Sequence, residues 1–130
     1  MNDQARYLVD ASGLMTWVNA GAGADDSDDI IDSAAISAVT LAVIAKQVGT
    51  NLEQYEVATA LDFGLEIIPL DEPLAKTIAQ IRNDTSSHTL SLENLVVLAT
   101  GRDRGLVIVT ADPAIAAIRI DGTEVHHVRT

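Results

Sequence analysis

The sequence predicts an α/β protein, a three-layer α/β/α sandwich around a five-stranded, mainly parallel sheet. Short apolar segments alternate with helical patterns along the chain, and this alternation builds parallel sheets that carry helices on both faces. The composition agrees, because 48% of the residues are hydrophobic but only 3% are aromatic, so small branched side chains must fill the core. The 130 residues fit one domain, 1–130, which is long enough to close its own core.

Five segments are predicted as strands. Each is short, rich in apolar or β-branched residues and bounded by turn residues. Because these segments are nearly continuously apolar, we expect them to be covered on both faces, as in a parallel sheet. The segments are 6–10, 34–37, 65–70, 106–110 and 124–128.

The helices are placed by residues that commonly begin or end a helix. Ser, Asn and Asp side chains accept hydrogen bonds from the free N–H groups of a first turn, and glycine ends many helices. Residues 19–29 are predicted as a loop that leads into a helix. The other predicted helices cover 38–48 after Ser37, the span from Asn51 to Gly64, 73–83 after Asp71, and 92–103 between Ser91 and Gly105.

Composition excludes several classes of site. The sequence has no cysteine, which rules out disulfides, thiolate metal sites and a cysteine nucleophile, and agrees with a reducing compartment. The first residues lack a basic segment followed by a long apolar run, and no uncharged stretch is long enough to span a bilayer. We therefore expect a cytoplasmic protein with no membrane partner.

The net charge limits the choice of partners. The chain carries 19 acidic and 8 basic residues, a formal net charge of −11, and its basic residues are scattered along the sequence. A strongly negative surface opposes close approach to a polyanion unless cations intervene. The composition therefore disfavours RNA as a partner.

Two aspartates follow predicted strands. Asp10 ends the first strand, and Asp112 stands just past the fourth. Ligands of open α/β sheets bind beyond the carboxyl ends of the strands. Either aspartate alone is more typical of a turn or a helix cap, but two carboxylates at neighbouring strand ends repel each other unless a cation or a shared proton relieves them.

Four segments occur in an order and spacing that is typical of one family. They are YLVDASGLMTWV, AAISAVTLAVIAK, LSLENLVVLATGRDRGL and VIVTADPAI. Together they cover nearly the whole chain, which resembles the PIN-domain family and in particular the small VapC-type toxins. The resemblance implies a PIN-like fold, a homodimer, an antitoxin-like protein partner, and an RNA-cleaving site in which four acidic residues hold Mg²⁺ or Mn²⁺.

The resemblance assigns the acidic positions one by one. The first acid is Asp10 and the last is Asp112, so these are the implied metal ligands and catalytic residues. The second position falls on Val43, which offers no ligand, and the third on Asn94, which offers a neutral amide oxygen in place of a carboxylate. Because Mg²⁺ is held mainly by charged oxygen ligands, we expect metal binding to be weak and any cleavage through Asp10, Asn94 and Asp112 to be slow or absent.

Three neighbouring residues bear on this site. Ser12 and Thr110 lie beside the two aspartates and are expected to orient ligands or to tie backbone groups. Glu93 precedes Asn94 but lies about 100° round the helix from it. A negative charge in a first turn is favoured by the helix dipole whatever the function, so we interpret Glu93 as a dipole charge.

Two functions remain open at this stage. The first is a PIN-like protein whose metal-dependent nuclease site is degenerate and which acts through binding. The alternative is an active Mg²⁺- or Mn²⁺-dependent ribonuclease toxin of a toxin-antitoxin pair. The missing acids and the charge of −11 favour the first, and the retained Asp10 and Asp112 support the second. The segment 37–45 is uncharged and apolar nearly all round, so it must be covered by the chain itself or by a second copy.

Overall fold

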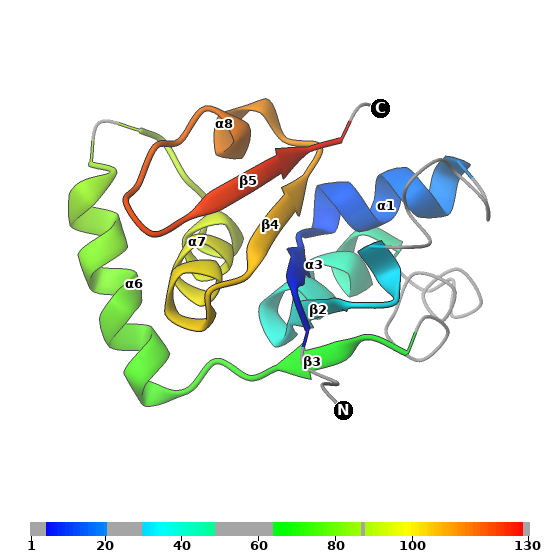
Figure 1. Cartoon of the computed structure of the whole chain (residues 1–130), viewed down its shortest axis with the longest axis horizontal. Helices are drawn as coiled ribbons and strands as arrows, with labels where there is room; N and C mark the ends of the chain where they lie inside the picture. Colours follow the sequence, from blue (N-terminus) through cyan, green and yellow to red (C-terminus); the bar gives the residue numbers. More distant parts are fainter. Residues whose placement is uncertain (1–4, 21–29, 49–63, 87, 129–130) are drawn as a thin grey trace.

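A computed structural model describes residues 5–20, 30–48, 64–86 and 88–128. Its sheet has five strands in the order β3-β2-β1-β4-β5, and all four pairings are parallel (Figure 1). The predicted α/β class with a five-stranded parallel sheet is therefore confirmed. In chain order the elements are β1 (Tyr7–Val9), α1 (Ala11–Ala20), β2 (Ala34–Ser37), α3 (Ala38–Val48), β3 (Glu66–Ile68), α6 (Glu72–Asp84), α7 (Leu92–Arg104), β4 (Val107–Thr110), α8 (Pro113–Ala116) and β5 (Glu124–His127).

Helices cover both faces of the sheet. Successive residues of a strand point to opposite faces, and in β1 Leu8 belongs to one buried cluster while Val9 belongs to the other. The cluster around Leu8 collects side chains from α6, α7 and α8, and the cluster around Val9 collects side chains from α1 and α3. The two clusters therefore fill the two interfaces between the central sheet and the helix layers that cover its faces, as the predicted three-layer arrangement requires.

The five strands lie inside the segments predicted for them. The largest difference is at β3, where only Glu66–Ile68 of the predicted 65–70 is extended. This strand is at an edge of the sheet and its residue Ile67 is 44% exposed. Pro69 lacks an N–H group and cannot donate to a ladder, which agrees with the end of the strand at Ile68.

The predicted caps are present where the structure describes them. Ser37 Oγ accepts from Val39 N at 3.0 Å, and Asp71 Oδ1 accepts from Leu74 N at 3.0 Å. Ser91 forms a capping box with Asn94, and Gly105 ends α7 in the left-handed conformation with φ 66°. The predicted loop at 19–29 begins too early, because residues 19 and 20 are the last residues of α1. The rest of that loop and the predicted helix after Asn51 up to residue 63 lie outside the described residues.

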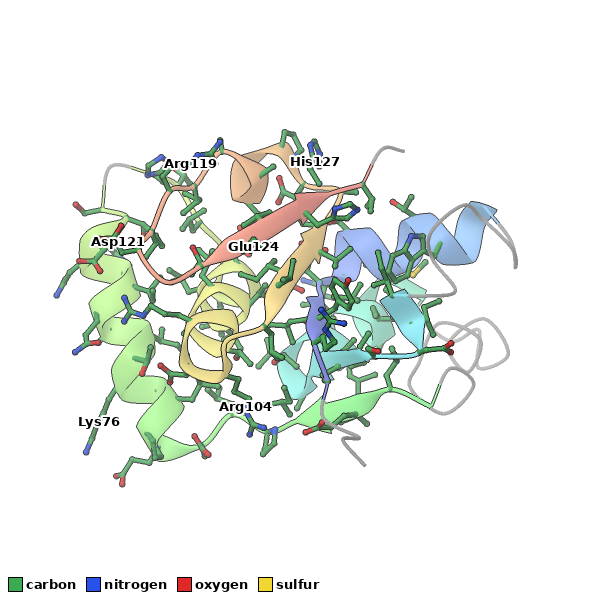
Figure 2. The ribbon with its side chains drawn as sticks, viewed as in Figure 1. Lys76, Arg104, Arg119, Asp121, Glu124 and His127 are labelled. Atoms are coloured by element: carbon green, nitrogen blue, oxygen red, sulfur yellow. The ribbon has the colours of Figure 1, made fainter. Side chains whose placement is uncertain are left out.

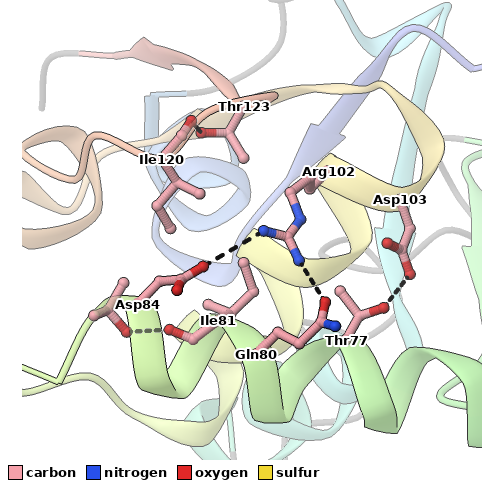
Figure 3. A network of polar contacts seen from close by, with 9 residues as sticks. Thr77, Gln80, Ile81, Asp84, Arg102, Asp103, Ile120 and Thr123 are labelled. Atoms are coloured by element: carbon pink, nitrogen blue, oxygen red, sulfur yellow. Dashed lines mark hydrogen bonds and ion pairs between the residues drawn. The ribbon is translucent and has the colours of Figure 1, made fainter.

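A polar network joins α6 to α7 (Figure 3). Arg102 donates to Gln80 at 3.1 Å and lies 3.7 Å from the Asp84 carboxylate. Thr77 donates to Asp103 at 2.8 Å. These contacts fix how α6 (green) lies against α7 (yellow) in Figure 1, and exposed pairs of this kind contribute little stability each.

Candidate functional site at the carboxyl edge of the sheet

The candidate site lies where β1 and β4 end side by side. Val9 is paired with Val109 in a parallel register, so the residues that follow the two strands reach the same edge of the sheet. Asp10 is buried there with 1% of its surface exposed, and Asp112 is half-buried. We call Asp10, Ser12, Glu93, Thr110 and Asp112 the carboxyl edge.

Asp10 caps the first helix. Its Oδ1 accepts from Gly13 N at 2.8 Å and from Ser12 Oγ at 2.8 Å, and its Oδ2 accepts from Thr110 Oγ1 at 2.5 Å. An aspartate immediately before a helix commonly accepts from the third N–H of that helix in this way. The buried carboxylate is therefore held by three neutral donors of this chain.

Gly13 allows this close approach. A Cβ atom at position 13 would lie 2.9 Å from Val109 O and 3.3 Å from Asp10 Oδ1. Val109 O already accepts from Asp10 N at 3.1 Å. The first turn of α1 therefore packs against β4 at a distance that only glycine permits without a shift.

The two hydroxyls connect the strand ends. Ser12 Oγ accepts from Ala111 N at 3.0 Å, and Thr110 Oγ1 accepts from Asp112 N at 2.9 Å. The hydroxyl oxygens are themselves 3.2 Å apart. Ser12 and Thr110 thus tie backbone groups, which is one of the two roles expected from the sequence, and they also donate to the Asp10 carboxylate.

Asp112 caps a second helix. Its Oδ1 accepts from Ala114 N at 2.8 Å, in the first turn of the four-residue helix α8. The turn-and-cap role that the sequence suggests for an aspartate after a strand is therefore present at both positions. The cap uses Oδ1 of each aspartate, while Oδ2 of Asp10 accepts from the Thr110 hydroxyl.

Glu93 joins the carboxyl edge from α7. Its Oε2 accepts from Ala11 N at 3.0 Å and from Thr40 Oγ1 at 2.9 Å. Glu93 is in the first turn of α7, as its interpretation as a dipole charge requires, and its side chain in addition extends toward α1 and α3. The sequence did not predict the role of Thr40. Its position could have indicated one, because Thr40 lies three residues before Val43, a position assigned to the site, and on the same face of the helix.

The two positions that lack an acid have other roles. Asn94 Oδ1 accepts from Ser91 N at 3.1 Å and Asn94 N donates to Ser91 Oγ at 3.0 Å, so its amide oxygen closes the capping box. Val43 is half-buried and packs against the cluster that contains Val9 and Leu14. The structure therefore brings Asp10 and Asp112 together, with Glu93 rather than Asn94 as the side chain of α7 that bonds across to α1.

The electrostatics of the carboxyl edge favour protonation of its buried acids. Burial raises the pKa of Asp10, against hydrogen bonds from Thr110, Gly13 and Ser12 that lower it, and the Asp112 charge raises it further. Burial also raises the pKa of Glu93, and so do the charges of Asp10 and Asp112, against the hydrogen bonds from Ala11 and Thr40. The ion pairs of Arg102 and Arg104 lie elsewhere in the described structure.

The described residues do not fit a resident divalent metal. Among them, no three histidine, aspartate or glutamate side chains are arranged so that they could hold one ion. Both oxygens of Asp10, one oxygen of Glu93 and one of Asp112 already accept hydrogen bonds from helix N–H groups or hydroxyls. Val43 adds only methyl groups, so no step of a metal-assisted reaction can be derived from this arrangement.

No family profile matches the sequence, and no curated protein sequence matches it significantly. Solved structures with the same architecture come from toxin-antitoxin complexes. One is VapBC2 from Rickettsia felis bound to a DNA fragment from its promoter, with a TM-score of 0.75, 16% identity and coverage of 94% of this chain and 98% of that one. Another is DNA-bound VapBC from Salmonella typhimurium, with a TM-score of 0.75, 20% identity and coverage of 95% and 98%.

A third solved structure has the same architecture as these two. VapBC-5 from Mycobacterium tuberculosis, described as a member of the VapBC family of toxin-antitoxin systems, has a TM-score of 0.68, 23% identity and coverage of 94% and 98%. The chain therefore has the fold of the VapC-type PIN domains, as the sequence motifs predicted. In the part that the structure describes, no helix is both long enough and apolar enough to traverse a bilayer.

Proposed function

We propose that this protein is a PIN-fold protein whose nuclease site is degenerate and which acts by binding. One observation carries the proposal. The carboxylates at the carboxyl edge accept hydrogen bonds from the chain's own helix N–H groups and hydroxyls, while Val43 and Asn94 supply no charged ligand. Mg²⁺ or Mn²⁺ binding at Asp10 and Asp112 is therefore weak in this proposal.

The proposed partner is an antitoxin-like protein. The structural neighbours were solved as toxin-antitoxin assemblies, and the same fold with a disabled site would keep its surface for such a partner. RNA is a less suitable partner, because the net charge is −11 and the few basic side chains are spread over several elements, with no more than two on α6 and two on α7. Figure 2 shows Lys76 on α6, Arg104 at the end of α7 and Arg119 after α8.

A homodimer through α3 is part of the same proposal. The helix carries no charge from Ala38 to Ala45, and several of its apolar side chains, including Leu41 and Val43, are only half-buried within one copy. Light scattering on the purified chain, alone and with Leu41→Glu, tests this part. The proposal expects a dimer that the substitution dissociates, and a monomeric natural chain would contradict it.

The test of the function measures metal binding and RNA cleavage on one sample. Mn²⁺ is titrated by calorimetry, and single-stranded RNA and tRNA are assayed for cleavage, with the natural chain compared with Val43→Glu/Asn94→Asp. We expect little binding and no metal-dependent cleavage by the natural chain, and a gain of both in the double variant. Asp10→Asn in the double-variant background is the matched control, because it removes the charge and keeps an oxygen that can cap α1.

The alternative function is an active ribonuclease toxin that depends on Mg²⁺ or Mn²⁺. The observation that favours it is the third carboxylate, because Glu93 lies close enough to Asp10 and Asp112 for their charges to raise its pKa. In that case the natural chain cleaves RNA when Mn²⁺ is added, and Asp10→Asn abolishes the cleavage. This result would overturn the degenerate-site proposal.

A further inference from the structure

We infer that Glu93 is the positioning residue of the carboxyl edge. Acting as a hydrogen-bond acceptor, it fixes the first peptide of α1, and with it the Asp10 carboxylate, against α3 and α7. The inference rests on the proposed function only in taking the carboxyl edge as the functional site. It concerns which residue of α7 orders that site, and it assigns the task to position 93 rather than to position 94.

One oxygen of Glu93 connects three helices. Oε2 accepts from Ala11 N in the first turn of α1 and from Thr40 Oγ1 in α3, while its own backbone belongs to the first turn of α7. The partners are 82 and 53 residues away in the sequence, and Thr40 is completely buried. Loss of this acceptor would leave the Ala11 N–H and the Thr40 hydroxyl without these bonds, which is costly in a buried place.

The contact with Ala11 acts directly on Asp10. Ala11 N belongs to the peptide that leaves Asp10, and Asp10 Oδ1 accepts from Gly13 N in the same turn. Two carboxylates therefore share the N–H groups that begin α1, one at its first residue and one at its third. The free N–H groups at the N-terminus of α1 carry partial positive charge and interact favourably with both carboxylates.

Asn94 cannot perform this task in the same backbone. Its amide oxygen accepts from Ser91 N and its N–H donates to Ser91 Oγ, so the residue is engaged in starting its own helix. Glu93, one residue earlier, is on a different side of the first turn and extends toward α1. The positioning role therefore depends on the reach of the glutamate side chain.

Two conservative substitutions separate positioning from a simple dipole effect. Glu93→Asp keeps the charge at the first turn but shortens the side chain by one bond, about 1.5 Å, which is too short for both contacts. Glu93→Gln removes the charge and keeps a carbonyl oxygen that can accept from Ala11 N and Thr40. A dipole charge requires only the carboxylate, whereas positioning requires only the acceptor at the right distance.

The experiment is amide hydrogen exchange followed by NMR on the full chain, residue by residue. We expect Glu93→Asp to speed exchange at Ala11 and Gly13 about tenfold relative to the centre of α7, and Glu93→Gln to leave both within about twofold of the natural chain. Glu72→Asp is the matched control, because Glu72 is an exposed acid in the first turn of α6. It should leave Ala11 and Gly13 unchanged.

Two results would overturn the inference. Unchanged exchange at Ala11 in Glu93→Asp means that the side chain contributes only its charge. Equal acceleration in Glu93→Gln means that the ionised group, and not the acceptor, holds the first turn. A merely structural loss of stability would accelerate exchange throughout α1 and α7 and not at these two amides alone. RNA cleavage by the natural chain would refute the proposed function and leave this result standing.

Discussion

Gly13→Ala is the sharpest test of how tightly α1 is packed against the sheet. The new Cβ would lie 2.9 Å from Val109 O, 3.3 Å from Asp10 Oδ1 and 3.3 Å from Val9 Cγ1. The first of these atoms is a backbone carbonyl near the end of β4 that also accepts from Asp10 N at 3.1 Å. It cannot move without weakening that hydrogen bond, so the clash must be relieved by moving α1.

The expected net effect is a loss of stability. Alanine gains about 1 kcal/mol over glycine inside a helix, but overpacking of a buried site costs about 1–3 kcal/mol and a weakened hydrogen bond adds about 1 kcal/mol. We therefore expect Gly13→Ala to lower the free energy of unfolding by roughly 1–3 kcal/mol, measured by urea denaturation at constant m-value. An unchanged or raised free energy would show that helix propensity dominates and that the approach is not tight.

Gly101→Ala provides the contrast. There the new Cβ would lie 2.7 Å and 2.8 Å from Cγ1 and Cδ1 of Ile108, which are side-chain atoms that can be removed. In a double-mutant cycle, Gly101→Ala with Ile108→Ala should recover part of the Gly101→Ala penalty, with a coupling above about 0.5 kcal/mol. Gly13→Ala with Val9→Ala should be additive, because the main obstacle at position 13 is backbone.

Two further predictions concern the carboxyl edge. Thr110→Val removes the hydroxyl that donates to Asp10 and accepts from Asp112 N, so it should lower the free energy of unfolding by about 1–3 kcal/mol. Thr110→Ser keeps the hydroxyl and should cost less than Thr110→Val. Equal losses in the two variants would refute a role for the hydroxyl. The pKa values of Asp10 and Glu93 are raised in the folded state, so their contribution to stability is complete below their unfolded pKa values and is lost as the pH rises through the folded values. Glu93→Gln should therefore gain stability relative to the natural chain as the pH rises above the ordinary glutamate pKa of about 4.3. A difference in urea titrations that stays constant as the pH rises would contradict the pKa direction.

The sequence predicts the architecture well because its signals are local. Capping residues such as Ser37, Asp71 and Ser91 act within three residues along the chain, and apolar strands identify themselves by composition and length. The placement of Asp10 and Asp112 at one edge also follows from the sequence, since parallel strands that are neighbours end on the same side. The order of the strands, β3-β2-β1-β4-β5, does not follow from local signals, because it depends on which strands pair across the sheet.

The sequence could not predict the contacts of Glu93. Helical periodicity places Glu93 and Asn94 about 100° apart, but it does not say which of the two faces the sheet edge. That choice depends on the capping box, which uses the Asn94 amide, and on the distance from α7 to α1, which is a tertiary property. The Thr40 contact was missed for the same reason, because its partner is 53 residues away.

The carboxyl edge also shows how its carboxylates serve the fold. In a βα unit the strand end is also the helix start, so a carboxylate there faces free N–H groups as well as a ligand site. Asp10 and Asp112 each cap the helix that follows them, and Glu93 takes the first N–H of α1. The buried acids are therefore stabilised by helix ends and hydroxyls of the chain itself. The presence of Asp10 and Asp112 therefore has a structural reason in these caps, and it is not by itself evidence of RNA cleavage.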